Sequence, residues 1–269
     1  MTARIITFSK DRGPQLFALL SSARDHLKDK NEYFVLWCAS SEESDKIYNQ
    51  VIEEFQDQFA FVREVDFRED VLRLIKENRN ERILFTPDDA LWIRETAIGD
   101  MCGYDKRFLP SLRLGQHLTK CHPVGNKEQN LPDFINKGDK HIWRWGDGHY
   151  DWGYPLALDT SIFLNEEIYE MATAVDFRSP TSFESNIQAF KDRYNNHAGV
   201  CYTDSRFVSI PWNAVTDEIS NLNGLIEPER FDNMWRDGYR IEHEAYYNTL
   251  PPSAHYEYKL RFVIKEKGA

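Results

Sequence analysis

The segment ERILFTPDDALWI, residues 81–93, decides the expected fold. Its first part, residues 82–86, is a short apolar run, and Pro87 and two carboxylates, Asp88 and Asp89, follow directly. A short apolar run that ends at turn-forming residues is typical of a buried strand. The segment therefore predicts a strand whose carboxyl end presents two acidic side chains.

Upstream of this segment, apolar runs alternate with helical patterns. Besides 82–86, strands are expected at residues 4–8, 33–38 and 59–65. Apolar residues recur at helical spacing between these runs, and Ser40 and Glu43 have the spacing of a capping box at the start of the second helix. Strands that alternate with helices predict an α/β fold, with a twisted, mostly parallel sheet flanked by helices.

Composition narrows the class of protein. The chain has 269 residues and a formal net charge of −11, which argues against general binding of nucleic acid. It has no apolar run of the roughly 20 residues that a transmembrane helix needs, and its start does not resemble a signal peptide. Its four cysteines are widely spaced and are expected to be free thiols. We therefore expect a cytoplasmic protein. Peripheral contact with a membrane is compatible with this expectation.

Ligands of open α/β sheets bind at the carboxyl ends of the strands. Neither a GxGxxG nor a GxxxxGK[ST] motif is present, which disfavours a Rossmann dinucleotide site and a P-loop. Asp88 and Asp89 offer the oxygen ligands that Mg²⁺ or Mn²⁺ prefers, and such a cation can bridge protein carboxylates and a diphosphate. The alternative is a polar turn, since Pro-Asp-Asp is a favourable turn sequence.

Residues 83–93 resemble the strand and DxD segment of GT-A-type glycosyltransferases, and RIITFSKDR at residues 4–12 is similar to their first nucleotide-binding strand and loop. The resemblance implies one GT-A-like domain over residues 1–269. Residues 1–110 would bind a nucleotide-diphosphate sugar, and the irregular, aromatic-rich residues 111–269 a glycan or small-molecule acceptor. It also implies Mn²⁺ or Mg²⁺ as cofactor. The strict Asp-x-Asp is absent, because Pro87 stands where the first Asp would be.

The resemblance also assigns roles to single residues. It makes Asp89 the direct metal ligand, and Asp88 a contact to the donor sugar or to the metal through water. A further metal ligand is expected from the C-terminal region, where His255 is favoured over His243. The remaining residues expected to bind the nucleotide-sugar are Phe8, Ser9, Arg12, Asp66 and Arg113.

An aromatic segment, WRWGDGHYDWGYP, occupies residues 143–155. Aromatic faces pack against sugar rings, and glycines allow close approach of a ligand, so Trp145, Trp152 and Tyr154 are expected to bind the acceptor. The alternative is a loop packed into the core.

Residues 180–184, PTSFE, resemble the segment that carries the catalytic carboxylate of inverting GT-A enzymes. Ser182 is expected to cap a helix, which would place Glu184 in its first turn, where the helix dipole favours the ionised carboxylate. Glu184 is then the expected general base for the acceptor hydroxyl. Alternatively, Glu184 is only a favourable first-turn acid. Asp159 is the reserve catalytic residue.

The expected activity is therefore a metal-dependent, inverting glycosyl transfer from a nucleotide-sugar to a hydroxyl. One alternative is a sugar-1-phosphate nucleotidyltransferase, although that class has a Gly-rich loop after the first strand and residues 9–14, SKDRGP, match it poorly. The other alternative is a glycan-binding module without metal-dependent affinity for a nucleotide.

Overall fold

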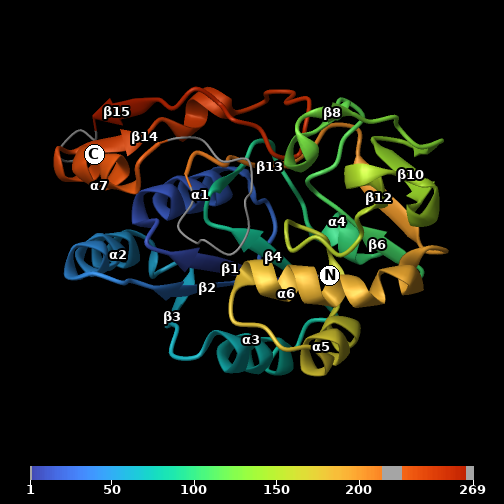
Figure 1. Ribbon diagram of the computed structural model, residues 1–269, viewed down its shortest axis with the longest axis horizontal. Coiled ribbons are helices and arrows are strands. Elements are labelled where there is room, and N and C mark those ends of the chain that lie inside the picture. Colours follow the sequence, from blue (N-terminus) through green and yellow to red (C-terminus); the bar gives the residue numbers. More distant parts are fainter. Residues whose placement is uncertain (1, 214–225, 265–269) are drawn as a thin grey trace.

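The computed structural model describes residues 2–213 and 226–264, which are built around a five-stranded sheet. The strand order is β11-β4-β1-β2-β3. Figure 1 shows β4, β1, β2 and β3 in this order. Four strands are parallel, and β11 is antiparallel to β4. The bounds are β1 (Ala3–Lys10), β2 (Glu32–Cys38), β3 (Ala60–Arg63), β4 (Arg82–Pro87) and β11 (Phe163–Leu164). The predicted α/β class with a mostly parallel sheet is confirmed.

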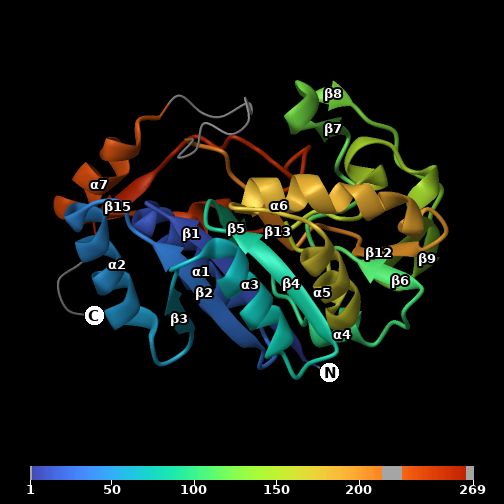
Figure 2. The same ribbon diagram turned by 60° about the horizontal axis from the view of Figure 1, so that its bottom comes forward.

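Helices cover both faces of this sheet. Alternate strand residues point to opposite faces, so Ile5 and Leu84 pack in one hydrophobic cluster while Ile6 and Phe85 pack in the other. The first cluster is closed by α1 (Gly13–His26) and α2 (Glu42–Phe55). The second is closed by α3 (Phe67–Lys76), α5 (Asn165–Ala174) and α6 (Pro180–Ile187), of which α3 and α5 lie next to each other (Figure 2).

A second sheet of four strands lies beside the first, with the order β6-β12-β10-β9. Its strands are β6 (Phe108–Pro110), β12 (Ala198–Tyr202), β10 (Lys140–Arg144) and β9 (Ile135–Lys137). Three short pairs complete the strands: β5 (Ala90–Trp92) with β13 (Phe207–Ser209), β7 (Lys120–Cys121) with β8 (Lys127–Glu128), and β14 (Tyr239–Ile241) with β15 (Phe262–Ile264). The remaining α-helices are α4 (Gly99–Cys102) and α7 (Pro228–Arg236).

Short 3₁₀ helices connect these elements: η1 (His122–Val124), η2 (Trp145–Asp147), η3 (Tyr150–Gly153), η4 (Gln188–Tyr194) and η5 (His243–Tyr246). Within the described residues, no helix is both long enough and apolar enough to cross a bilayer.

Two predicted helix starts are wrong by a few residues. Ser41, and not Ser40, caps α2, because its hydroxyl accepts the backbone N–H of Ser44. Ser179 caps α6 in a capping box with Ser182, so the helix begins earlier than expected. Glu184 therefore lies beyond the first turn, where the helix dipole stabilises a carboxylate less.

Candidate active site

A cavity of about 720 Å³ opens at the carboxyl ends of β1 and β4. Its opposite walls come from α6, from the loop before β11 and from the C-terminal segment. It is lined by every predicted site residue except Asp66, Trp145 and Trp152. An open cavity of similar volume beside α3 contains none of them. The topology thus gathers the expected donor-binding and catalytic residues around one space.

Asp88 is buried and holds the loop after β1. Its carboxylate accepts hydrogen bonds from Ser9 Oγ at 2.9 Å, from the Lys10 backbone N–H at 3.2 Å and from Arg12 Nη1 at 3.0 Å. Burial raises the pKa of Asp88 to about 6, and the Arg12 guanidinium opposes that rise. Because three donors hold this carboxylate and its side chain is only 5% exposed, Asp88 suits the role of organising the strand-end loops better than that of binding a cation directly.

Asp89 is the more accessible member of the pair, with 16% of its side chain exposed against 5% for Asp88. Its Oδ2 lies 2.9 Å from Arg12 Nη1. The same guanidinium donates through Nη2 to the Asn213 carbonyl at 2.6 Å. Arg12 therefore ties the ends of β1 and β4 to the loop after β13, next to the one carboxylate of the pair that remains open to a ligand.

Glu184 reaches the cavity from α6 with both carboxylate oxygens held. The Tyr154 hydroxyl donates to Oε1 at 3.1 Å and the Leu158 N–H donates to Oε2 at 2.7 Å. Burial raises the pKa of Glu184; the Leu158 N–H opposes this rise, and the nearby Asp159 adds to it. A positioned carboxylate with a raised pKa is suited to act as a base near neutral pH.

Asp159 lies in the same wall and is buried. Ser209 Oγ donates to its Oδ2 at 2.9 Å, and His255 Nε2 lies 3.6 Å from the same oxygen. Burial raises the pKa of Asp159, while His255 and Arg113 oppose the rise. Its Oδ1 is buried and has no hydrogen-bond partner among the residues described here.

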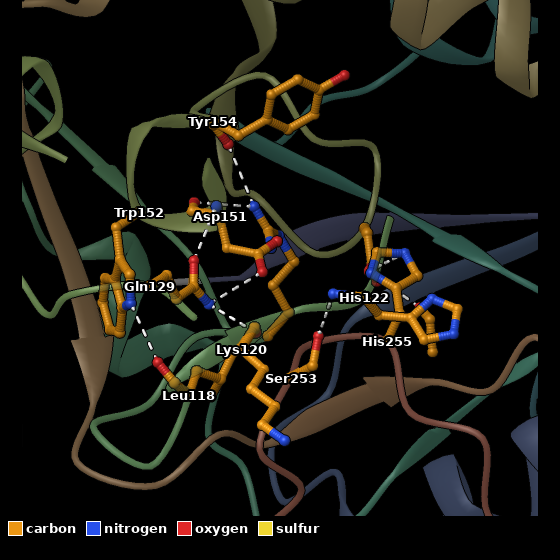
Figure 3. A network of polar contacts seen from close by, with 12 residues as sticks. Leu118, Lys120, His122, Gln129, Asp151, Trp152, Tyr154, Ser253 and His255 are labelled. Carbon is orange, nitrogen blue, oxygen red and sulfur yellow. Dashed lines mark hydrogen bonds and ion pairs between the residues drawn. The ribbon is translucent and has the colours of Figure 1, made fainter. Parts of the chain in front are cut away.

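Asp89 and His255, which line the same cavity, are chemically suited to a divalent cation. His255 Nδ1 is buried and unpartnered within the described chain, so this imidazole and the Asp89 carboxylate both have ligand capacity to spare. Carboxylate oxygen and imidazole nitrogen are ligands that Mn²⁺ accepts, whereas Mg²⁺ favours oxygen alone. His255 and His122 both line the cavity, where Figure 3 shows them from close by.

Arg113 does not offer its guanidinium to a donor phosphate, contrary to expectation. The side chain is buried; Nη1 donates to Asp151 Oδ1 at 2.7 Å and Nη2 to the Tyr154 carbonyl at 3.2 Å. Gln129 donates to the other Asp151 oxygen at 3.2 Å (Figure 3). Arg113 thus fixes the loop that places Tyr154 against Glu184.

Asp66 is also placed differently from the prediction. It caps α3, accepting the backbone N–H of Glu69 at 2.9 Å, and it does not line the cavity. The physical reason is that β3 ends at Arg63 and not at residue 65, so Glu64 is the acidic residue at the strand end. Glu64 lines the cavity.

The tryptophans of the aromatic segment are core residues, which corrects their assignment to an acceptor site. Trp145 and Trp152 are 2% and 0% exposed. Their indole N–H groups donate to the carbonyls of Leu109 and Leu118 at 3.2 and 3.4 Å. Tyr154 lines the cavity, as expected, and so does Tyr150.

The cavity residues to which the sequence reasoning gave no role include Lys10, Glu64 and Tyr150. Lys10 and Glu64 had a usable signal, because each stands at a strand end. Tyr150 belongs to the aromatic segment, but its place at the cavity depends on a left-handed backbone with φ of 51°.

Comparison with known proteins fits this geometry. No family model matches the chain. The bifunctional glycosyltransferase pgtA of Dictyostelium discoideum is 30% identical over 187 residues, which is 61% of this chain and 24% of pgtA. The crystal structure of S. aureus TarS superposes with a TM-score of 0.51, covering 79% of this chain and 37% of TarS at 14% identity. The structure of the TarS fragment 1–349 in complex with UDP-GlcNAc superposes with a TM-score of 0.50. The superposition covers 86% of this chain and 63% of the fragment at 14% identity.

The chain has a GT-A-like fold. It spans about a quarter of the length of pgtA. The cavity lies at the carboxyl ends of the strands, which is where open α/β sheets bind their ligands.

Proposed function

We propose that this chain is a glycosyltransferase that moves a sugar from a nucleotide-diphosphate sugar to an acceptor hydroxyl with inversion, assisted by Mn²⁺ or Mg²⁺. The observation that carries the proposal is the shared cavity. Asp89 at the end of β4 and Glu184 on α6 line one space, as a donor site and a catalytic base must. The 30% sequence identity with the glycosyltransferase pgtA over 187 residues supports the same activity.

The donor would bind along the ends of β1 and β4. Phe8, which packs against Phe85 at a centroid distance of 5.5 Å, forms an apolar wall there, and Lys10 supplies positive charge toward a diphosphate. Asp89 and His255 would hold the cation, which would offset negative charge on the leaving diphosphate. TarS has been solved with UDP and with UDP-GlcNAc, so uridine nucleotides are the first donors to test.

The transfer itself needs a base for the acceptor hydroxyl. Glu184 accepts one hydrogen bond at each oxygen, and a carboxylate oxygen has two acceptor positions, so capacity for the acceptor remains. In our proposal Glu184 takes the hydroxyl proton as the oxygen attacks the anomeric carbon. Leu158 and Tyr154 keep its carboxylate oriented during this step.

Calorimetry of UDP binding with and without Mn²⁺ tests the donor site. We expect Mn²⁺-dependent affinity in the wild type and in Asp57→Ala, which removes an exposed carboxylate outside the cavity. In Asp89→Ala that affinity should fall by more than the about 10–100-fold that losing an outer-shell partner costs. Equal Mn²⁺-dependent affinity in all three proteins would contradict the assignment of Asp89.

The same protein preparation separates the alternative functions. A glycosyltransferase releases UDP from a UDP-sugar when an acceptor is supplied. A nucleotidyltransferase instead releases pyrophosphate from a nucleoside triphosphate and a sugar 1-phosphate. A glycan-binding module binds sugar and shows neither reaction.

A further inference from the structure

A cluster of one histidine and two carboxylates, side chains of the kinds that ligate metals, lies outside the cavity, where the end of α1 meets η5. Asp25, His243 and Glu244 each offer a ligand atom, and these atoms all lie within 4.8 Å of one another. None of the three residues lines the cavity. We propose that these residues, the α1–η5 cluster, bind a transition-metal cation of the Zn²⁺ class.

The geometry of His243 suits a metal ligand. Its Nδ1 lies 3.4 Å from the Ile241 carbonyl, which can accept only from the Nδ1–H tautomer. The lone pair is then on Nε2, which lies 3.7 Å from Asp25 Oδ2. That separation is too long for a hydrogen bond, yet close to the ~3.4 Å between two ligands of a tetrahedral zinc ion with bonds of ~2.1 Å.

A supporting residue orients the carboxylate. The Tyr247 hydroxyl donates to Asp25 Oδ2 at 2.7 Å, as the outer partners of metal ligands commonly do. Tyr247 also packs edge-on against His26 at a centroid distance of 4.2 Å. His26 is 8% exposed, and both of its ring nitrogens are buried without a hydrogen-bond partner in the described structure. A second imidazole with unused hydrogen-bonding capacity therefore lies next to the cluster.

Charge at this place also favours a cation. Asp25 lies in the last turn of α1, where the helix dipole disfavours a carboxylate, and Glu244 adds a second negative charge. Lys28, which follows α1, is paired with Glu95 at 2.9 Å and donates to the Asp25 backbone carbonyl. A bound cation would offset the negative charge of Asp25 and Glu244, which Lys28 does not neutralise.

The cluster joins distant parts of the chain. Tyr247 and Asp25 are 222 residues apart, and the segment that follows η5 carries His255 into the cavity. A cation bound only by the folded chain would stabilise it by mass action and would clamp this segment to α1.

Zinc binding without nucleotide tests the proposal, in an Asp89→Ala background that removes the proposed donor-site ligand. We expect calorimetry to show Zn²⁺ binding and the melting temperature to rise with Zn²⁺. Adding His243→Ala should weaken Zn²⁺ binding by at least about tenfold. Adding His149→Ala, which removes an exposed histidine outside the cluster, should leave it unchanged.

Asp25→Asn provides a second variant that keeps the size of the side chain and its Tyr247 partner. Circular dichroism without metal establishes that each variant is folded. Weaker Zn²⁺ binding in both His243→Ala and Asp25→Asn supports the proposal. Absence of Zn²⁺ binding in the Asp89→Ala protein, or equal affinity in all variants, overturns it without bearing on UDP binding at the cavity.

Discussion

The strand-end residues of β1 and β4 and the aromatic segment 143–155 both have compositions suited to binding a nucleotide-sugar or a glycan. The structure places them in opposite environments. Ser9, Arg12, Asp88 and Asp89 meet at the cavity, whereas Trp145 and Trp152 lie in the hydrophobic core. Residue type is therefore a weaker guide to a site than the position that the topology gives to the residue.

The physical reason lies in what each side chain needs when buried. A tryptophan needs a single acceptor, which a backbone carbonyl supplies, so Trp143, Trp145 and Trp152 can enter the core at little polar cost. A carboxylate pair needs several donors or a cation, which is far harder to provide inside. The glycines also serve packing: a Cβ at Gly148 would lie 2.0 Å from the Trp152 carbonyl oxygen.

The largest effect is expected from a substitution in the cavity, at the proposed catalytic residue. Glu184→Gln keeps the size of the side chain but removes its ability to take a proton, so turnover should fall by about 10²–10⁴-fold. Donor affinity and the melting temperature should change little, because the phosphate site lies at the strand ends. Steady-state kinetics of UDP release, calorimetry of UDP binding and thermal unfolding measure the three quantities.

Glu166→Gln is the matched control, since it makes the same change at an exposed position on α5. It should retain full turnover. Near-full turnover of Glu184→Gln would remove Glu184 from the mechanism and make Asp159, in the same wall, the next residue to test.

The second prediction concerns the aromatic segment, residues 143–155. Trp152→Ala leaves a large cavity in the core and should lower the free energy of unfolding by about 3–5 kcal/mol, while the folded fraction keeps its affinity for UDP. Tyr150→Ala, in the same segment but 43% exposed at the cavity, should change stability by less than about 0.5 kcal/mol.

Chemical denaturation and calorimetry provide both measurements. The comparison between core and site would fail if Trp152→Ala kept full stability and lost acceptor use, because the indole would then have to face a ligand. A raised acceptor KM in Tyr150→Ala alone would assign the acceptor contact to that ring.

The smallest effect is a shift in pH dependence. A base must be deprotonated to act, so activity should fall as the pH is lowered through the pKa of Glu184. Burial raises that pKa, and the acid limb should therefore lie above the value of about 4.3 for a free glutamate. Below the midpoint kcat should drop about tenfold per pH unit. An acid limb at or below the value of a free glutamate would contradict the raised pKa.

The sheet could be predicted because apolar runs and helical spacing are local signals, and the four parallel strands lie where these signals place them. The carboxylates at the end of β4 followed from position within that pattern, whereas Glu184 followed from the resemblance of residues 180–184 to a segment of inverting GT-A enzymes. The contacts that complete the site are long-range: Arg12 donates to the carbonyl of Asn213, 201 residues away, and Tyr154 to Glu184. No local spacing encodes such pairs.

Two further errors came from element boundaries that were two or three residues off. The early end of β3 moved Asp66 from a strand end to a helix cap, and Ser179 took the capping role expected of Ser182. A shift of this size is invisible to apolar periodicity, yet it decides which carboxylate faces a ligand.

The pairing of β11 with β4 has a consequence for how the chain folds. Phe163 and Leu164, from the second half of the sequence, hydrogen-bond along the outer side of β4. A fragment that ended at residue 110 would leave this side of β4 as an exposed, apolar edge strand, a surface on which other chains readily add and aggregate. The two halves should therefore unfold in a single cooperative transition, with strand β11 protecting the protein from self-association.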